Sequence, residues 1–203
     1  MKKQPRDVTH LLAPANILWN ILIDYGHDAK SLLLEEGIDR EMILKPGARI
    51  SHARSDSLCS KVDELIDDPC WGLRGAKCWH PSHFNALGHA WLASSTLREA
   101  INRATRYAHI LGEDREHRVE DTAKGLTVTL SRSMKLPAIM DLAMSIWLSA
   151  CRLNYGPDLN PVEVNFIHSQ LACAEQYNSY FKAPVNFNAD YDSFTLPADA
   201  VDR

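Results

Sequence analysis

The segment that most constrains the fold is an apolar stretch in the second half of the chain, at residues 136–153. Apolar side chains there leave hardly any polar face: Ile139, Met140, Leu142, Ala143, Met144, Ile146, Trp147, Leu148, Ala150 and Cys151. A helix of this kind has no side to turn to water, so the rest of the chain must surround it. We therefore expect one central buried helix. No uninterrupted apolar run is long enough to span a bilayer, so we expect no membrane partner.

A second helix is marked by its start signal. Thr96 stands three residues before Glu99, the spacing of a capping box in which hydroxyl and carboxylate satisfy each other's free backbone donors. Apolar residues then recur at three-and-four spacing, namely Leu97, Ala100, Ile101, Ala104, Tyr107, Ala108 and Leu111. The pattern predicts an amphipathic helix over 97–111, ended by Gly112.

The remaining patterns divide the chain into a helical half and a half that contains strands. Helices are expected over 8–25, 29–36 and 52–66, with Asp39 and Ser51 as N-terminal caps. Further on, strict alternation over 126–130 predicts a hairpin with a strand near Val119. Three more strands are expected at 162–166, 185–187 and 193–196, with a helix over 172–181 after the first of them. We predict a single α+β domain over 1–203, in which a small antiparallel sheet packs on helices.

Composition and charge argue against several functions. A net charge of -4 and a pI near 6.1 do not suit a chain that grips DNA by itself. Ser94 and Ser95 lack the flanking glycines of a nucleophile elbow, and no other catalytic motif is present, so we expect no enzyme. The five cysteines have no framework spacing, which favours reduced thiols in a cytoplasm.

Two local features invite a sharper interpretation. Cys70, Cys78, His80 and His83 lie close in sequence, but their spacing is not that of a standard zinc site, so we expect no metal and no cofactor. Asp141 is a carboxylate within the buried helix. It needs a partner such as an arginine, or a place near the helix N-terminus.

Five segments follow one another along the chain: LLEEGID at 33–39, DPCWGLR at 68–74, STLREA at 95–100, FKAPVNF at 181–187 and FTLP at 194–197. In this order they resemble the N-terminal effector-binding domain of AraC-type transcriptional regulators. The resemblance implies a ligand-sensing domain that binds a small organic effector and controls an attached DNA-binding module. It also implies a cytoplasmic homodimer. Regulators of this type continue into two basic helix-turn-helix motifs that this sequence lacks. The chain is therefore expected to be either an isolated sensing half or a stand-alone relative. We favour the sensing half, which would reach DNA only through that module.

The expected effector site lies where the capped helix meets the buried one. Apolar candidates there are Trp79, Phe84, Trp91, Tyr107, Met140, Met144 and Trp147. These residue types suit a binding cavity, and they suit a closed core equally well. Arg106, His80 and His83 are candidates to meet a carboxylate if the effector is acidic. The alternative is an assembly domain without a pocket, in which surplus apolar area on the buried helix forms a two-fold interface.

Overall fold

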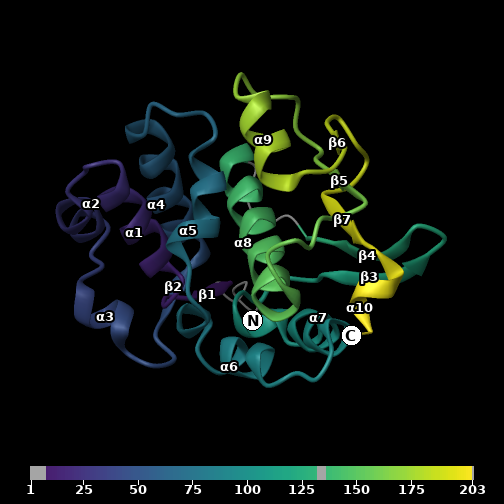
Figure 1. Ribbon diagram of the computed structural model, residues 1–203. Helices are drawn as coiled ribbons and strands as arrows, with labels where there is room; N and C mark the ends of the chain where they lie inside the picture. The colour runs from purple at the N-terminus through teal and green to yellow at the C-terminus, as the bar shows by residue number, and fades with distance from the viewer. Residues whose placement is uncertain (1–7, 132–135, 203) are drawn as a thin grey trace, which may run out of the picture.

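The central element of the fold is α8 (Pro137–Tyr155), seen in a computed structural model that describes residues 8–131 and 136–202. Figure 1 shows helices on one side of α8 and a sheet on the other. The buried side chains form two clusters, one with the helices and one with the sheet, and α8 contributes to both. This confirms the expected central helix, with bounds that differ from 136–153 by one residue at the start and two at the end. None of the helices within the described ranges is long and apolar enough to cross a membrane.

Within the described residues, six helices build the N-terminal side. They are α1 (Ala15–Asp24), α2 (Ala29–Glu35), α3 (Arg40–Leu44), α4 (His52–Leu65), η1 (Trp71–Arg74) and α5 (Gly75–Cys78). Side chains cap three of them, α2, α3 and α4. The carboxylate of Asp39 accepts a hydrogen bond from the Met42 N–H, and the Ser51 hydroxyl accepts one from the Arg54 N–H. Both caps confirm the sequence prediction.

The expected helix over 8–25 is wrong in its first part. Residues Thr9–Leu11 form strand β1, which pairs antiparallel with β2 (Arg49–Ser51). Pro14 disfavours helical geometry at the residue before it, so α1 begins only at Ala15. The Leu11 N–H donates to the Leu111 carbonyl at 2.7 Å, which also explains why the chain turns away from a helix there.

The main sheet has five strands in the order β3-β4-β7-β5-β6. Their bounds are Arg118–Thr122, Gly125–Thr129, Ser193–Leu196, Glu163–Asn165 and Val185–Asn186 in that order. The hairpin and the α+β class are confirmed. The sheet is not wholly antiparallel, because β5 and β6 run parallel. Helix α9 (Ala174–Phe181) connects these two strands, and a helical crossover of this kind returns the chain in its original direction.

Between α5 and the sheet, α7 differs from the predicted helix. The elements there are η2 (Pro81–Phe84), α6 (Ala86–Leu92), α7 (Leu97–Arg106) and η3 (Ala108–Ile110). A last helix, α10 (Ala198–Val201), follows β7. The Thr96 hydroxyl caps the Glu99 N–H at 3.1 Å, but the Glu99 carboxylate accepts from Ser95 instead of returning to Thr96. Helix α7 starts at the predicted residue and ends five residues before the predicted end. The short 3-10 helix η3 then continues to Ile110.

Two of the cysteines are not free thiols. Cys70, just before η1, forms a disulfide with Cys173, just before α9, across a sequence separation of 103. The expectation that all five thiols are reduced is wrong for this pair. Helix η1 packs on α8 and also contacts α9, a long-range contact that cysteine spacing does not reveal.

Candidate functional site

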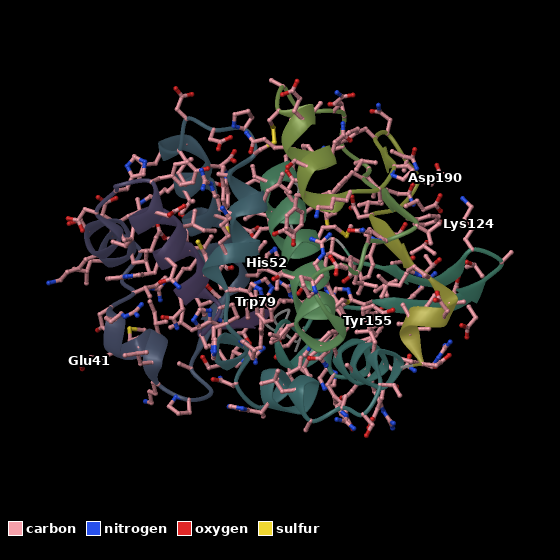
Figure 2. All side chains as sticks on the ribbon, viewed as in Figure 1. Glu41, His52, Trp79, Lys124, Tyr155 and Asp190 are labelled. Carbon is pink, nitrogen blue, oxygen red and sulfur yellow. A yellow bond between two sulfur atoms is a disulfide. The ribbon has the colours of Figure 1, made fainter. Side chains whose placement is uncertain are left out.

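A cavity of about 220 Å³ lies beside α8, where this helix faces β1, α1, α4 and α6. Its lining is mostly apolar and includes Leu11, Ile17, Leu18, Leu58, Phe84, Leu87, Trp91, Ala104, Met140, Ile146 and Trp147. Figure 2 labels Trp79, which lines the cavity, and His52 near the middle of the molecule, between the helical side and the sheet side. The core is therefore hollow at this point.

One face of α8 forms a wall of the cavity. The lining residues of this helix follow three-and-four spacing: Ile139, Met140, Leu142, Ala143, Ile146, Trp147 and Ala150. Met144 and Leu148 lie on another face and are fully buried in the sheet-side core. A molecule in the cavity would thus contact a helix whose other face carries the sheet.

Two tryptophans of the cavity wall have hydrogen-bond partners for their indole N–H groups. The Trp79 Nε1 donates to the Ser149 hydroxyl at 2.7 Å, and the Trp91 Nε1 donates to the Ala150 carbonyl at 3.1 Å. The ring of Trp147 stands edge-on to Trp91, with ring centroids 5.8 Å apart. With these two donors satisfied, the Trp79 and Trp91 rings contribute apolar area to the cavity wall.

The cavity also has polar lining residues, and Arg115 is the most unusual of them. The residue is half-buried, and its Nε atom is buried without a hydrogen-bond partner. Burial lowers the pKa of Arg115, although the nearby Asp114 carboxylate opposes this. A buried, partly unpaired cation is costly, so the arrangement favours an anion beside it.

His117 lies near Arg115 and is held in one tautomer. Its Nδ1 accepts a hydrogen bond from the Ser131 N–H at 3.1 Å, so the neutral ring carries its proton on Nε2. Burial, and secondarily Arg115, lowers the pKa of His117 to about 4. The ring also stands edge-on to Trp147, with centroids 5.8 Å apart.

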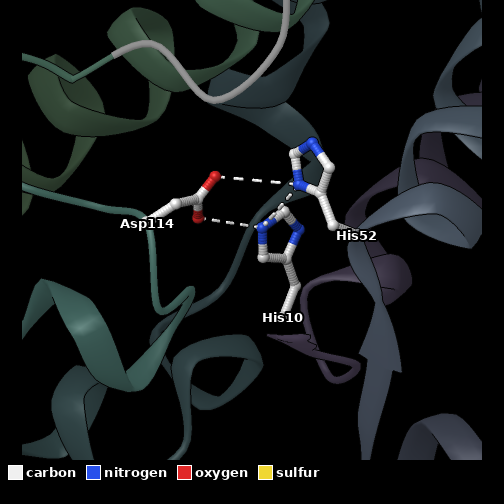
Figure 3. A group of neighbouring side chains, drawn as sticks. All are labelled: His10, His52 and Asp114. Atoms are coloured by element: carbon white, nitrogen blue, oxygen red, sulfur yellow. Dashed lines mark hydrogen bonds and ion pairs between the residues drawn. The ribbon is translucent and has the colours of Figure 1, made fainter. Parts of the chain in front are cut away.

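At the edge of the cavity, His10, His52 and Asp114 form a compact cluster, shown in Figure 3. The His10 Nε2 lies 3.0 Å from the Asp114 Oδ1 and 3.2 Å from the His52 Nδ1. The His52 Nδ1 lies 3.7 Å from the Asp114 Oδ2. Burial, then the charge of Arg115, lowers the pKa of His10.

The structure brings together part of the predicted effector site. Trp79, Phe84, Trp91, Met140 and Trp147 line the cavity. The other predicted residues lie outside the lining: Met144 in the core, Arg106 and Tyr107 exposed at the C-terminal end of α7, and His80 and His83 as mutual caps of η2.

Sequence reasoning missed the polar residues of the cavity. Arg115 lies among the acidic neighbours Glu113, Asp114 and Glu116, and His10 falls in the range 8–25 that was predicted to be a helix. The available signal was a basic residue three positions before the strand at Arg118–Thr122.

Two further expectations concern polar residues away from the cavity. Asp141 has no arginine partner within the described residues, and its Oδ1 instead lies 3.2 Å from the His168 Nε2. Cys70, with its disulfide to Cys173, does not gather with Cys78, His80 and His83.

The fold is an α+β domain with a cavity beside its central helix, which has room for a small molecule. The chain belongs to the family described as the arabinose-binding domain of AraC transcription regulators, N-terminal part, which it matches over residues 26–203. It is therefore a regulatory domain of AraC type, as the ordered motifs predicted.

Individual relatives agree with this family. The chain is 25% identical over 209 residues to the ornithine utilization regulator of Pseudomonas aeruginosa, covering 99% of this chain and 61% of that protein. The crystal structure of the transcriptional regulator CdpR from Pseudomonas aeruginosa shares the fold, with a TM-score of 0.64, 18% identity, and coverage of 92% of this chain and 56% of that one. The chain thus spans less than two thirds of each of these relatives.

Proposed function

We propose that this chain is an effector-sensing domain that binds a small, largely apolar molecule carrying an acid group, and so controls an attached DNA-binding module. The observation that carries the proposal is the apolar cavity of about 220 Å³ beside α8, with Arg115, whose buried Nε lacks a hydrogen-bond partner, among its lining residues. DNA would be contacted only by the module of a longer, homodimeric and cytoplasmic regulator.

The size of the cavity suits a small organic ligand. An engineered apolar cavity of about 150 Å³ stays dry and binds benzene, so a larger space lined by tryptophan and aliphatic side chains offers room for a ring or a short chain. Such a ligand would gain from removal of its apolar surface from water, at roughly 25 cal/mol per Å².

The acid group is assigned to Arg115 because the buried Nε of this residue has no hydrogen-bond partner. A carboxylate beside the guanidinium would form charge-assisted hydrogen bonds that are about twice as strong as neutral ones. Arg106, His80 and His83, the residues first considered for this role, do not line the cavity. Arg115 replaces them in the proposal.

Binding would act by a shift between conformations. A ligand changes an equilibrium only by its difference in affinity for the two states. The ligand would contact one face of α8, and the opposite face packs on the sheet, so a small displacement of this helix would reach both cores. In the full-length regulator such a displacement would alter the freedom of the DNA-binding module.

A ligand panel tests this function directly. We expect at least one apolar carboxylic acid to raise the melting temperature, since a ligand present at about 100 times its Kd adds roughly 2.7 kcal/mol of stability. Its methyl ester should give a smaller shift. Arg115→Gln should abolish the preference for the acid, whereas Arg106→Gln, a change at an exposed arginine, should leave it intact. Equal responses of the two variants would contradict the assignment of Arg115.

Filling the cavity separates a receptor from a scaffold. Ala143→Leu adds a side chain to the cavity wall and should remove ligand binding while keeping or raising the stability of the free protein. Ala86→Leu, on the exposed face of α6, should bind as the parent does. A panel with no stabiliser, or an Ala143→Leu protein that still responds fully, would overturn the sensing role.

The alternative of a pure assembly domain has lost its motivation. It rested on surplus apolar surface along the buried helix, but the apolar side chains of α8 pack into the two cores of the same chain. A dimer of the full regulator remains compatible with sensing.

A further inference from the structure

We propose that His10, His52 and Asp114 form a binding site for a divalent transition-metal ion, with Zn²⁺ as the best-suited ion. The three residues come from β1, the first turn of α4 and the loop before β3, so segments far apart in sequence meet at one point (Figure 3). The proposal does not depend on the sensing role of the cavity.

The spacing of the donor atoms fits a tetrahedral ion. Metal bonds of about 2.0–2.1 Å place neighbouring ligand atoms of a tetrahedron about 3.3 Å apart. The His10 Nε2 lies 3.0 Å from the Asp114 Oδ1 and 3.2 Å from the His52 Nδ1, and one donor atom from each of the three residues lies within 4.8 Å of the other two. Two imidazoles and one carboxylate are also a donor set that zinc commonly takes.

A carboxylate behind His52 orients its ring toward the cluster. The His52 Nε2 lies 3.1 Å from the Asp56 Oδ2, one helical turn further along α4. With the Nε2 proton donated to Asp56, the neutral ring presents a lone pair from Nδ1 to His10 and Asp114. Metal-bound histidines usually have such a carboxylate on their second nitrogen, which fixes the ring and strengthens the bond to the ion.

The backbone around the cluster is held without any ion. The His52 N–H donates to the Val8 carbonyl at 2.8 Å, and the Glu113 N–H donates to the Thr9 carbonyl at 3.3 Å. Gly112 allows the close approach, because a Cβ there would lie 2.9 Å from the His10 ring and 3.1 Å from the Asp114 Oδ1. A site with its ligands already in place spares an ion much of the cost of ordering them.

The local charges leave room for a cation. Asp56 and Asp114 contribute two negative charges, and Arg115 is the nearby positive charge that offsets one of them. Three protein ligands leave the fourth tetrahedral position to water or to an oxygen of another molecule. His10 also lines the cavity, so the proposed ion would stand at its edge.

Metal titration of the tag-free, EDTA-stripped chain tests the site. We expect one Zn²⁺ per chain by calorimetry, and one Co²⁺ with a visible spectrum of tetrahedral character and no thiolate charge-transfer band. His52→Gln and Asp114→Asn should each weaken binding at least 100-fold. Asp56→Asn keeps all three ligands and should weaken it about 10-fold, which guards against a variant that merely fails to fold.

The matched control is the other histidine pair of the chain. His80→Gln combined with His83→Gln should leave the affinity unchanged, because these rings cap η2 and lie away from the cluster. Circular dichroism of each variant confirms that it is folded. The proposal is overturned if the parent chain binds neither ion at micromolar concentration, if the loss follows His80 and His83, or if the cobalt spectrum shows sulfur ligation.

Discussion

Asp141, in the first half of α8, accepts a hydrogen bond from the hydroxyl of Tyr177 in α9, with an Oη to Oδ2 distance of 2.7 Å. The other carboxylate oxygen lies 3.2 Å from the His168 Nε2, and Asp141 has no exposed surface. Burial raises the pKa of Asp141, and the hydrogen bonds to His168 and Tyr177 oppose that rise. One carboxylate thus connects the central helix to two segments of the C-terminal half.

Removal of this carboxylate should destabilise the fold strongly. Asp141→Ala leaves the Tyr177 hydroxyl and the His168 ring buried without their partner, and breaking such a buried network costs about 3–5 kcal/mol. Tyr177→Phe removes one hydrogen bond and should cost about 1–3 kcal/mol. Urea unfolding measures both. Asp158→Ala, at an exposed carboxylate beyond α8, is the control and should stay within about 0.5 kcal/mol of the parent. A loss in Asp141→Ala no larger than in this control would contradict the role of the network.

Local sequence patterns predicted the elements whose folding is decided locally. The apolar stretch predicted α8, because a helix without a polar face must be surrounded. The caps at Asp39, Ser51 and Thr96 predicted helix starts, because each is a contact over three residues. The same local logic identified the five aromatic and methionine residues that line the cavity.

Contacts between distant segments could not be read in this way. Strand β1 forms through its pairing with β2, and residues 8–25 alone look like a helix. The parallel pairing of β5 and β6 and the disulfide between Cys70 and Cys173 also depend on how segments pack. Arg115 lies among acidic neighbours in sequence, and only the folded chain encloses it beside the cavity.

His117 should make stability depend on pH between about 6.5 and 4. The pKa of His117 is lowered from 6.5 to about 4, so between these pH values the ring is protonated in the unfolded chain and neutral in the folded chain. Protonation therefore stabilises the unfolded state as pH falls. The free energy of unfolding should decrease by about 1–2 kcal/mol between pH 7 and pH 5 through this group. His117→Gln should reduce the difference in unfolding free energy between these two pH values. An unchanged difference would show that other groups cause the acid sensitivity.

The disulfide predicts a definite thiol count. Denatured, unreduced protein should react at three thiols, Cys59, Cys78 and Cys151, and reduced protein at five. Because the bond closes a long loop, its reduction should cost about 2–4 kcal/mol of stability, which is the typical range. Cys70→Ser should reproduce that loss in the absence of reductant, and Cys78→Ser should not. Five reactive thiols before reduction would refute the pairing.

Gly72 allows η1 to pack directly on the first turns of α8. A Cβ at this position would overlap the Ala138 carbonyl oxygen and lie 2.8 Å from the Asp141 Cβ, and a helix backbone cannot move aside as a flexible side chain can. Gly72→Ala should therefore cost about 3 kcal/mol or more in urea unfolding. Gly47→Ala is the matched control, because Gly47 has a φ of +71 but open space around it, so only backbone strain of about 1 kcal/mol is expected. A smaller loss at Gly72 than at Gly47 would mean that η1 does not pack against α8 as closely as the structure has it.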